Sequence, residues 1–285
     1  MPPFEEQASH ATDCGCKPTP FLIHEFGTLY DDDMEQGDLH HFIVTRFNLG
    51  ALGDHKAEPP ETRFSERWFV SKLVLMKHFA IPSVRAQSER PTWAILVDEE
   101  SPLKQLELLG ETLRKEENTI IIQVDSDWMH KLPLTLSELT DKSWIATTRF
   151  DVDDALRSNF CSVVRKKFAE KPRRSVIDLP NGMLFSRRSN VLQSRWKLGN
   201  QFLTLIVERG YGRTIYFEGP HADARRRFGE CSYEIVETKD PMWILVDHDD
   251  NLTRRRKRAA ADRPSVSLSQ ERYKDIEVDF GVALR

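Results

Sequence analysis

The chain has 285 residues, of which 39% are hydrophobic and 30% charged, and its formal net charge is −4. This composition is typical of a globular protein with a substantial core, in one large domain or two small ones. No apolar run approaches the roughly 20 residues that span a bilayer, and Met1 to Cys16 lack the apolar stretch of a secretory signal. The net acidity argues against a dedicated nucleic-acid binder. We therefore expect a cytoplasmic protein with no specific nucleic-acid partner.

Residues 1–38 are expected to form a flexible arm, because they are rich in proline and contain the acidic run 31–33. Within this arm, a short regular element is expected only at 21–26. Cys14 and Cys16 lie near histidines and could bind zinc, but their spacing is not a usual zinc-site pattern. Since reduced thiols are normal in the cytoplasm, no role is assigned to these cysteines.

The next part of the chain alternates between two patterns. Apolar stretches with polar residues at their carboxyl ends are predicted to be strands: 41–48, 93–97, 119–124 and 144–150. Stretches with apolar residues three and four apart are predicted to be helices: 66–80, 103–116 and 155–168, with a short helix or loop at 132–140. Pro82 either stops the first of these helices or marks its turn. Such alternation predicts an α/β fold with a mostly parallel central sheet, right-handed crossovers and flanking helices.

The second half is less regular. Residues 176–179 and 182–185 resemble a hairpin, 202–208 is apolar and ambiguous between strand and helix, and 214–217 and 243–246 are predicted strands. Residues 254–285 begin with a basic run and continue with Ala, Pro and Ser, so we expect a flexible tail. The basic run could contact an anionic membrane surface, or it could be a solvated charge run.

Polar side chains follow three of the predicted strands. They are Thr45, Arg46 and Asn48 after the first, Asp98, Glu99 and Ser101 after the second, and Asp151, Asp153 and Asp154 after the fourth. In a parallel sheet these ends converge on one edge, where a nucleotide binds. Carboxylates this close repel one another unless a cation offsets their charge. Asp151 and Asp153 therefore suit Mg²⁺ or Mn²⁺ carrying a polyphosphate, although the last two aspartates could instead cap a following helix.

The order of these pieces resembles a glycosyltransferase of the GT-A type. Ser83 to Gln87, the strand that ends in Asp98-Glu99-Glu100-Ser101, and Arg149 to Asp154 resemble motifs of family 2 glycosyltransferases. Four segments together resemble the bacterial family named putative rhamnosyltransferases, over roughly residues 41–256: 44–48, 68–87, 148–154, and 243–248 with Asn251. The resemblance implies a GT-A-like nucleotide-diphospho-sugar transferase domain at 39–253, with a nucleotide-binding half (39–156) and an acceptor half (157–253).

The resemblance also implies roles for single residues. Thr45, Arg46 and Asn48 would lie along the nucleotide, and Asp98 with Glu99 would contact its base or ribose. Glu99 departs from the family 2 pattern, where a second Asp is usual. Asp151 would hold the ribose and the metal, and Asp153 would be the better direct metal ligand. Arg149, Arg187 and Arg188 are equal candidates for stabilising the leaving diphosphate.

Two further roles stay open at this point. A late histidine is a metal ligand in some enzymes of this fold, and His248 and His221 are the candidates. An inverting transferase also needs a carboxylate general base near the acceptor. The candidates for this base are Asp223, Asp178 and Glu218, although Asp223 could instead start the helix at 224–227.

The sequence thus predicts a glycosyltransferase dependent on Mn²⁺ or Mg²⁺. It would move a sugar, for which the resemblance suggests rhamnose, from a nucleotide-diphosphate donor to a glycan, lipid-linked or protein acceptor. A nucleotidyl or phosphoryl transferase is the alternative enzyme, but the loop 48–53 lacks its glycine-rich phosphate pattern. A non-enzymatic polyanion-binding module built on the arginines of 225–227 and 254–258 is opposed by the net acidity.

Overall fold

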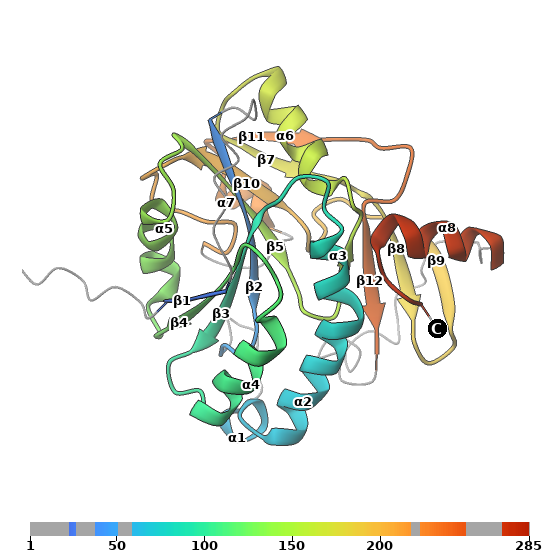
Figure 1. Ribbon diagram of the computed structural model, residues 1–285. Helices are drawn as coiled ribbons and strands as arrows, with labels where there is room; N and C mark the ends of the chain where they lie inside the picture. The colour runs from blue at the N-terminus through green and yellow to red at the C-terminus, as the bar shows by residue number, and fades with distance from the viewer. Residues whose placement is uncertain (1–22, 27–37, 51–58, 218–222, 249–269, 285) are drawn as a thin grey trace, which may run out of the picture.

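The computed structural model describes residues 23–26, 38–50, 59–217, 223–248 and 270–284, which form two sheets flanked by helices (Figure 1). The larger sheet has the order β1-β4-β3-β2-β5-β10-β7-β11. Its strands are β1 (Ile23–Phe26), β2 (Leu39–Arg46), β3 (Thr92–Asp98), β4 (Thr119–Val124), β5 (Trp144–Phe150), β7 (Ser175–Asp178), β10 (Thr204–Glu208) and β11 (Ser232–Ile235). The smaller sheet has the order β6-β12-β8-β9, formed by β6 (Ala155–Leu156), β8 (Asn181–Ser186), β9 (Val191–Trp196) and β12 (Trp243–Asp247).

The centre of the larger sheet confirms the predicted parallel α/β core. Strands β4, β3, β2 and β5 are adjacent and parallel. The first of them in the chain, β2, lies in the middle, with β3 and β4 on one side and β5 on the other. Strands β1, β10 and β7 continue the sheet in antiparallel fashion, and β11 is parallel to β7. Three strands of the predicted acceptor half therefore extend the sheet of the nucleotide-binding half, and the two halves share one framework.

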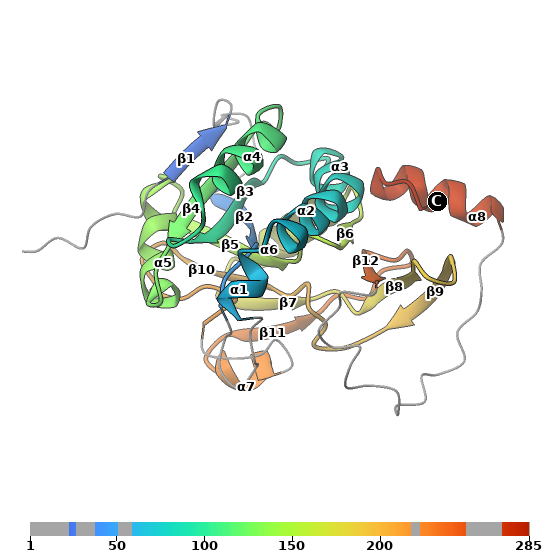
Figure 2. The ribbon, with the colours of Figure 1, turned by 90° about the horizontal axis from the view of Figure 1, so that it is seen from below.

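Helices cover both faces of this sheet. They are α1 (Pro60–Arg63), α2 (Glu66–Leu75), the π-helical turn η1 (Met76–Ala80), α3 (Ile81–Arg85), α4 (Leu103–Leu113), α5 (Trp128–Glu138), α6 (Phe160–Glu170) and α7 (Ala224–Arg227). Strand alternation sends Ile43 to the core shared with α2, α4 and α6, and Val44 to the core shared with α5 and α7. Figure 2 shows α2, α3 and α4 on one side of the sheet and α7 on the other.

The helix predicted at 66–80 starts as expected, and of the two roles expected for Pro82 the structure excludes the stop, because the chain stays helical beyond it. Ser65 caps it, with its Oγ accepting a hydrogen bond from the Trp68 N–H (3.3 Å). The chain then makes the π-helical turn η1 and continues through α3 to Arg85. Pro82 sits in the first turn of α3, and a proline is tolerated there because its missing N–H needs no partner.

Three other local predictions are wrong. The predicted helix 155–168 is two elements, because Ala155–Leu156 pairs with β12 and α6 begins only at Phe160. Residues 214–217 form a turn and no strand. The predicted hairpin is absent, since β7 belongs to the larger sheet and β8 to the smaller one. Gly182 helps β8 enter the smaller sheet, because a Cβ at this position would lie 2.1 Å from the Trp243 ring.

The carboxyl-terminal part of the predicted flexible tail is a packed helix, α8 (Gln270–Phe280). Both figures place α8 beside β8, β9 and β12, and its apolar side chains join Phe79 and Phe185 in one buried cluster. Phe280 is 0% exposed there. The basic run 254–258, with its predicted membrane contact, lies outside the described residues, as do Cys14 and Cys16. None of the described helices is long and apolar enough to cross a membrane.

We expect Phe280→Ala to lower the free energy of unfolding by about 3–5 kcal/mol, because it leaves a cavity between α8 and the smaller sheet. Urea denaturation followed by circular dichroism measures this. The matched control is Val278→Ala on the same helix, where the side chain is 79% exposed and the expected change is within about 0.5 kcal/mol. Equal midpoints for the two variants would contradict the packed position of α8.

Candidate functional site

The candidate site lies where β2, β3 and β5 end. The register pairs Thr45 with Phe150 and Arg46 with Leu96, so these strands finish at nearly the same level. From β2 the chain moves outward on one side to β3 and then β4, and it returns from β4 to place β5 on the other side of β2. The β2–β5 boundary is therefore the topological switch point of the sheet. Open α/β sheets bind ligands in the crevice outside such a boundary.

On one side of this edge, a set of hydrogen bonds holds Asp98. Its Oδ2 pairs with Arg63 Nη1 at 2.5 Å, and its Oδ1 accepts from the Glu100 N–H at 2.9 Å. The Asn48 side chain accepts from the Asp98 N–H (3.0 Å) and donates to Ser101 Oγ (2.8 Å). Asp98 is therefore fixed in place at the end of β3, with 18% of its side chain exposed.

At the switch point itself, two arginines share one tyrosine ring. The guanidinium carbons of Arg46 and Arg149 lie 5.2 and 5.8 Å from the centre of Tyr216, whose hydroxyl donates to the Val44 carbonyl at 2.9 Å. Arg149 also pairs with Asp151 at 3.2 Å. Burial, and then the charge of Arg149, lower the pKa of Arg46. Burial raises the pKa of Tyr216 to about 12. The Tyr216 hydroxyl therefore remains neutral beside the two cations.

Arg46 has less compensation than its neighbour. No carboxylate in the described part of the chain forms an ion pair with it, and its buried Nε has no hydrogen-bond partner there. An uncompensated buried cation costs free energy unless an anion pairs with it. This end of the sheet therefore suits an anionic group.

On the other side of the edge, Asp153 contacts two basic groups. Its Oδ2 lies 2.7 Å from His248 Nε2 and 3.1 Å from Lys72 Nζ. The antiparallel pairing of β6 with β12 explains the first contact, because it sets the residues before β6 beside those after β12. The same pairing lets Asp154 Oδ1 accept from the Val246 N–H at 2.9 Å. Asp154 is thus a bridge between strands and not the helix cap that its position suggested.

The two neighbouring carboxyl groups have opposite pKa shifts. Burial acts to raise the pKa of Asp153, but the Lys72 charge and the His248 hydrogen bond outweigh it and lower that pKa. Burial, together with the charges of Asp153 and Asp151, raises the pKa of Asp154 well above its usual range. Asp153 is therefore the carboxylate that stays ionised here.

The donors around Asp153 fit a divalent cation in type. A carboxylate and an imidazole lie in direct contact, and Mg²⁺ or Mn²⁺ held by them would take its remaining ligands from substrate phosphates and water. No group of three His, Cys, Asp or Glu side chains that could hold a metal occurs among the described residues. The Lys72 ammonium contacts Asp153 Oδ2, the oxygen that would also bind a metal held between Asp153 and His248. These residues can hold a cation, but only in competition with Lys72.

Two predicted site residues lie away from this edge. Thr45 is 0% exposed and its Oγ1 accepts from the Trp93 indole N–H at 2.9 Å, because strand alternation turns it toward the core while Arg46 faces the other way. Asp178 is also 0% exposed, and its carboxylate accepts from Asn200, the Gly199 N–H and Tyr233. Burial raises the pKa of Asp178. The structure gives these two side chains roles in packing.

The remaining predicted site residues are Asp223, Glu99, Glu218 and His221. Asp223 precedes α7 as expected, but its carboxylate pairs with Arg226 at 3.1 Å and makes no capping bond. Glu99 follows Asp98 and is exposed. Glu218 and His221 lie outside the described residues.

Sequence reasoning missed Lys72, Arg63 and Tyr216. Each comes from a helix or turn far along the chain from the strand end that it contacts. For Lys72, the sequence offered one signal of a partly buried position: it directly precedes the apolar Leu73 in the predicted helix.

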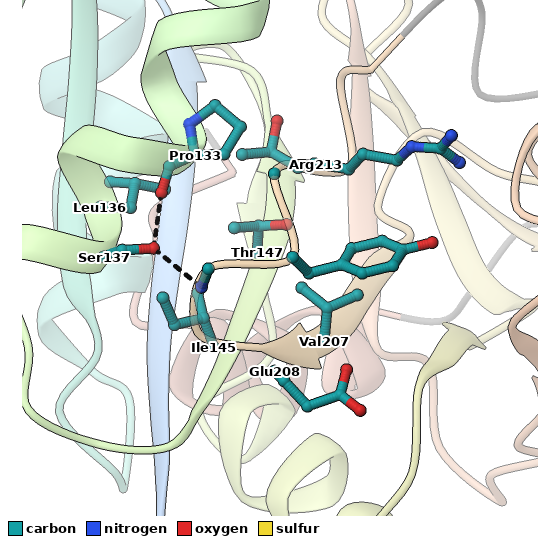
Figure 3. Close-up of a pocket in the computed structure, with 12 residues that line it drawn as sticks. Pro133, Leu136, Ser137, Ile145, Thr147, Val207, Glu208 and Arg213 are labelled. Carbon is teal, nitrogen blue, oxygen red and sulfur yellow. Dashed lines mark hydrogen bonds between the residues drawn. The ribbon is translucent and has the colours of Figure 1, made fainter.

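A small, partly open pocket lies elsewhere, beside Ile145 and Thr147 of β5 and the loop 209–214 (Figure 3). Its lining is mostly apolar, and the hydrogen bonds drawn there join Ser137 Oγ to the Pro133 carbonyl (2.7 Å) and to the Gly210 N–H (3.3 Å). It contains none of the charged groups of the sheet edge, so we assign it no part in the site.

We expect Asp154→Asn to become more stable relative to the wild type as the pH rises from about 4 to 7. The folded pKa of Asp154 lies above the usual 3.8, so the folded wild type keeps a proton that the unfolded chain releases. Wild-type stability therefore falls over that interval, by up to about 1.4 kcal/mol per pH unit, and asparagine removes this loss. Urea denaturation in EDTA measures it. The exposed Asp141→Asn is the control, and a pH-independent difference for Asp154→Asn would contradict the expectation.

Solved structures with a similar arrangement share little sequence with this chain. A "putative nucleotide-diphospho-sugar transferase from Desulfovibrio desulfuricans G20" is 11% identical, covers 75% of this chain and 83% of its own, and has a TM-score of 0.38. Residues 1–349 of S. aureus TarS in complex with UDP-GlcNAc are 10% identical, with 74% and 60% covered and a TM-score of 0.41. A cytidylyltransferase from Leptospira borgpetersenii is 9% identical, with 72% and 77% covered and a TM-score of 0.41. At TM-scores below 0.5 these similarities decide nothing about the site.

Among curated proteins, none matches the chain. The family comparison is decisive, because residues 40–260, well over half of the 285, match the family described as "Putative rhamnosyl transferase". This interval contains the charged groups at the sheet edge, from Arg46 to His248. The chain therefore belongs to this family of glycosyltransferases.

Proposed function

We propose that this glycosyltransferase takes its sugar from a nucleotide-diphosphate donor bound at the carboxyl edge of β2, β3 and β5, and transfers it with the help of Mn²⁺ or Mg²⁺. The observation that carries the proposal is the meeting of Asp153 and His248, 95 positions apart, at 2.7 Å beside the switch point. Folding brings a carboxylate and an imidazole together where open α/β sheets bind nucleotides. Rhamnose is the sugar that the family description suggests.

The diphosphate of the donor would meet Arg46 and Arg149. Both guanidinium groups are largely buried against Tyr216, and a buried arginine pairs strongly with phosphate oxygens through charge-assisted hydrogen bonds. Their positions on β2 and β5 place them on either side of the switch point. Asp98, held by Arg63 and Asn48, is the group proposed to contact the base or ribose, and Asp151 is proposed as a ribose partner next to Arg149.

Asp153 and His248 would hold the divalent cation, which when bound would supply Lewis-acid stabilisation of the leaving diphosphate. The contribution of this chain is to keep the two ligands fixed. Asp153 remains ionised, and the β6–β12 pairing places His248 beside it. Arg46 and Arg149 would add electrostatic stabilisation as negative charge grows on the leaving group.

The acceptor would be the hydroxyl group of a glycan, a lipid-linked sugar or a protein. Of the three candidate general bases, Asp178 is engaged in buried hydrogen bonds, and Glu218 is outside the described residues. Asp223 is the one retained in the proposal, because its side chain is 45% exposed and pairs only with a neighbour on its own short helix. Its role would be to take the proton from the attacking hydroxyl.

We expect Asp153→Asn to abolish the Mn²⁺-dependent part of nucleoside diphosphate binding, because the amide removes the charged ligand. Isothermal titration calorimetry with and without Mn²⁺ measures this, using the diphosphate selected by a thermal-shift screen of UDP, GDP, ADP, CDP and dTDP. The control is Asp141→Asn, an exposed aspartate in the loop before β5. Metal-dependent binding that survives in Asp153→Asn would refute the proposed metal ligand.

We expect Arg46→Gln to weaken nucleoside diphosphate binding about 10- to 100-fold even in EDTA. The reason is that a hydrogen bond to a charged group contributes about 1.5–3 kcal/mol. Arg90→Gln is the matched control, since Arg90 lies before β3 at the opposite edge of the sheet and is 57% exposed. Unchanged affinity in Arg46→Gln would mean that the diphosphate binds elsewhere. The two variants together separate the anion site from the metal site.

A further inference from the structure

Lys72 is a basic group at the candidate metal site that the proposed mechanism does not use. It belongs to α2, and its ammonium reaches Asp153 Oδ2 at 3.1 Å with only 14% of its side chain exposed. The same ammonium lies 5.9 Å from the centre of the Trp68 ring, one helical turn earlier. Lys72 therefore occupies a defined position, unlike the solvated lysines of most helix surfaces.

The contact compensates a charge that would otherwise be costly. Asp153 has 12% of its side chain exposed and lies next to two other aspartates, so without a cation its charge would be poorly stabilised. His248 contacts the same oxygen. A lysine ammonium and a divalent cation satisfy the same need, and a cation held by Asp153 together with His248 would share Oδ2 with the ammonium.

We propose that Lys72 is a built-in counter-ion that occupies Asp153 when no metal is bound and leaves it when Mn²⁺ or Mg²⁺ binds. This inference rests on the proposed metal role of Asp153 and goes beyond it. Because the two cations compete for one carboxylate, Lys72 weakens metal binding to the donor-free protein. The released ammonium becomes a cation available to the diphosphate of the donor, so that metal and donor favour each other's binding.

The test is the affinity of the donor-free protein for Mn²⁺ alone, measured by electron paramagnetic resonance titration. We expect Lys72→Met and Lys72→Gln, which remove the charge, to bind Mn²⁺ at least tenfold more tightly than the wild type. Lys72→Arg keeps the charge and should bind like the wild type. Lys77→Met, an exposed lysine in the following turn, is the matched control and should also be unchanged.

Two further measurements test whether the gain in Mn²⁺ affinity depends on Asp153. In an Asp153→Asn background, Lys72→Met should give no gain in Mn²⁺ affinity, because the shared ligand is gone. Saturating Mn²⁺ should also raise the melting temperature of Lys72→Met more than that of the wild type, since the metal replaces the missing counter-ion. This second readout remains available if the variant is less stable than the wild type.

The failures are distinguishable. Unchanged or weaker Mn²⁺ binding in both neutral variants, with binding lost in Asp153→Asn, would overturn the competition and leave the metal site in place. Absence of Mn²⁺ binding in the wild type and in both neutral variants would overturn the metal site and the competition together.

Discussion

The contact between Asp153 and His248 is the constraint on which the candidate site depends. Asp153 follows a strand of the larger sheet, and His248 follows a strand of the smaller one. Their 2.7 Å contact exists because β6 pairs antiparallel with β12, and because Asp154 accepts the Val246 N–H beside them. The two sheets are thus joined at the place where Asp151, Asp153 and Asp154 lie, and both sheets contribute to the site.

The charged side chains at the carboxyl edge of the larger sheet form two groups, one of arginines and one around Asp153. Arg149 lies at the end of β5 with Arg46 across the switch point, and Asp153 follows four residues later. The first group has a buried cation in need of an anion, and the second has a buried anion that already attracts a cation. A nucleotide diphosphate with a divalent metal carries complementary charges for both. This complementarity links the fold to the glycosyltransferase chemistry of the family.

The second half of the chain contributes strands, side chains and a helix to the structure around the candidate site. Strands β10, β7 and β11 widen the sheet beyond β5, and the turn at 214–217 supplies the Tyr216 ring that both arginines contact. The smaller sheet carries His248, and α8 packs over that sheet as the last described helix. Residues after 156 therefore supply part of the framework around the candidate site.

Local sequence was sufficient for the parallel core, since strands buried on both faces are continuous apolar runs and their polar ends converge by topology alone. It was also sufficient to place Arg46, Asp98 and Asp153 at one edge. It could not tell that the Thr45 side chain points into the core while the Arg46 side chain points to the site. That direction depends on which face of β2 the core covers. Lys72, Tyr216 and the pairing of His248 with Asp153 were decided only by tertiary structure. Each is a contact between segments distant in the chain, fixed by strand register and helix packing that no local pattern encodes.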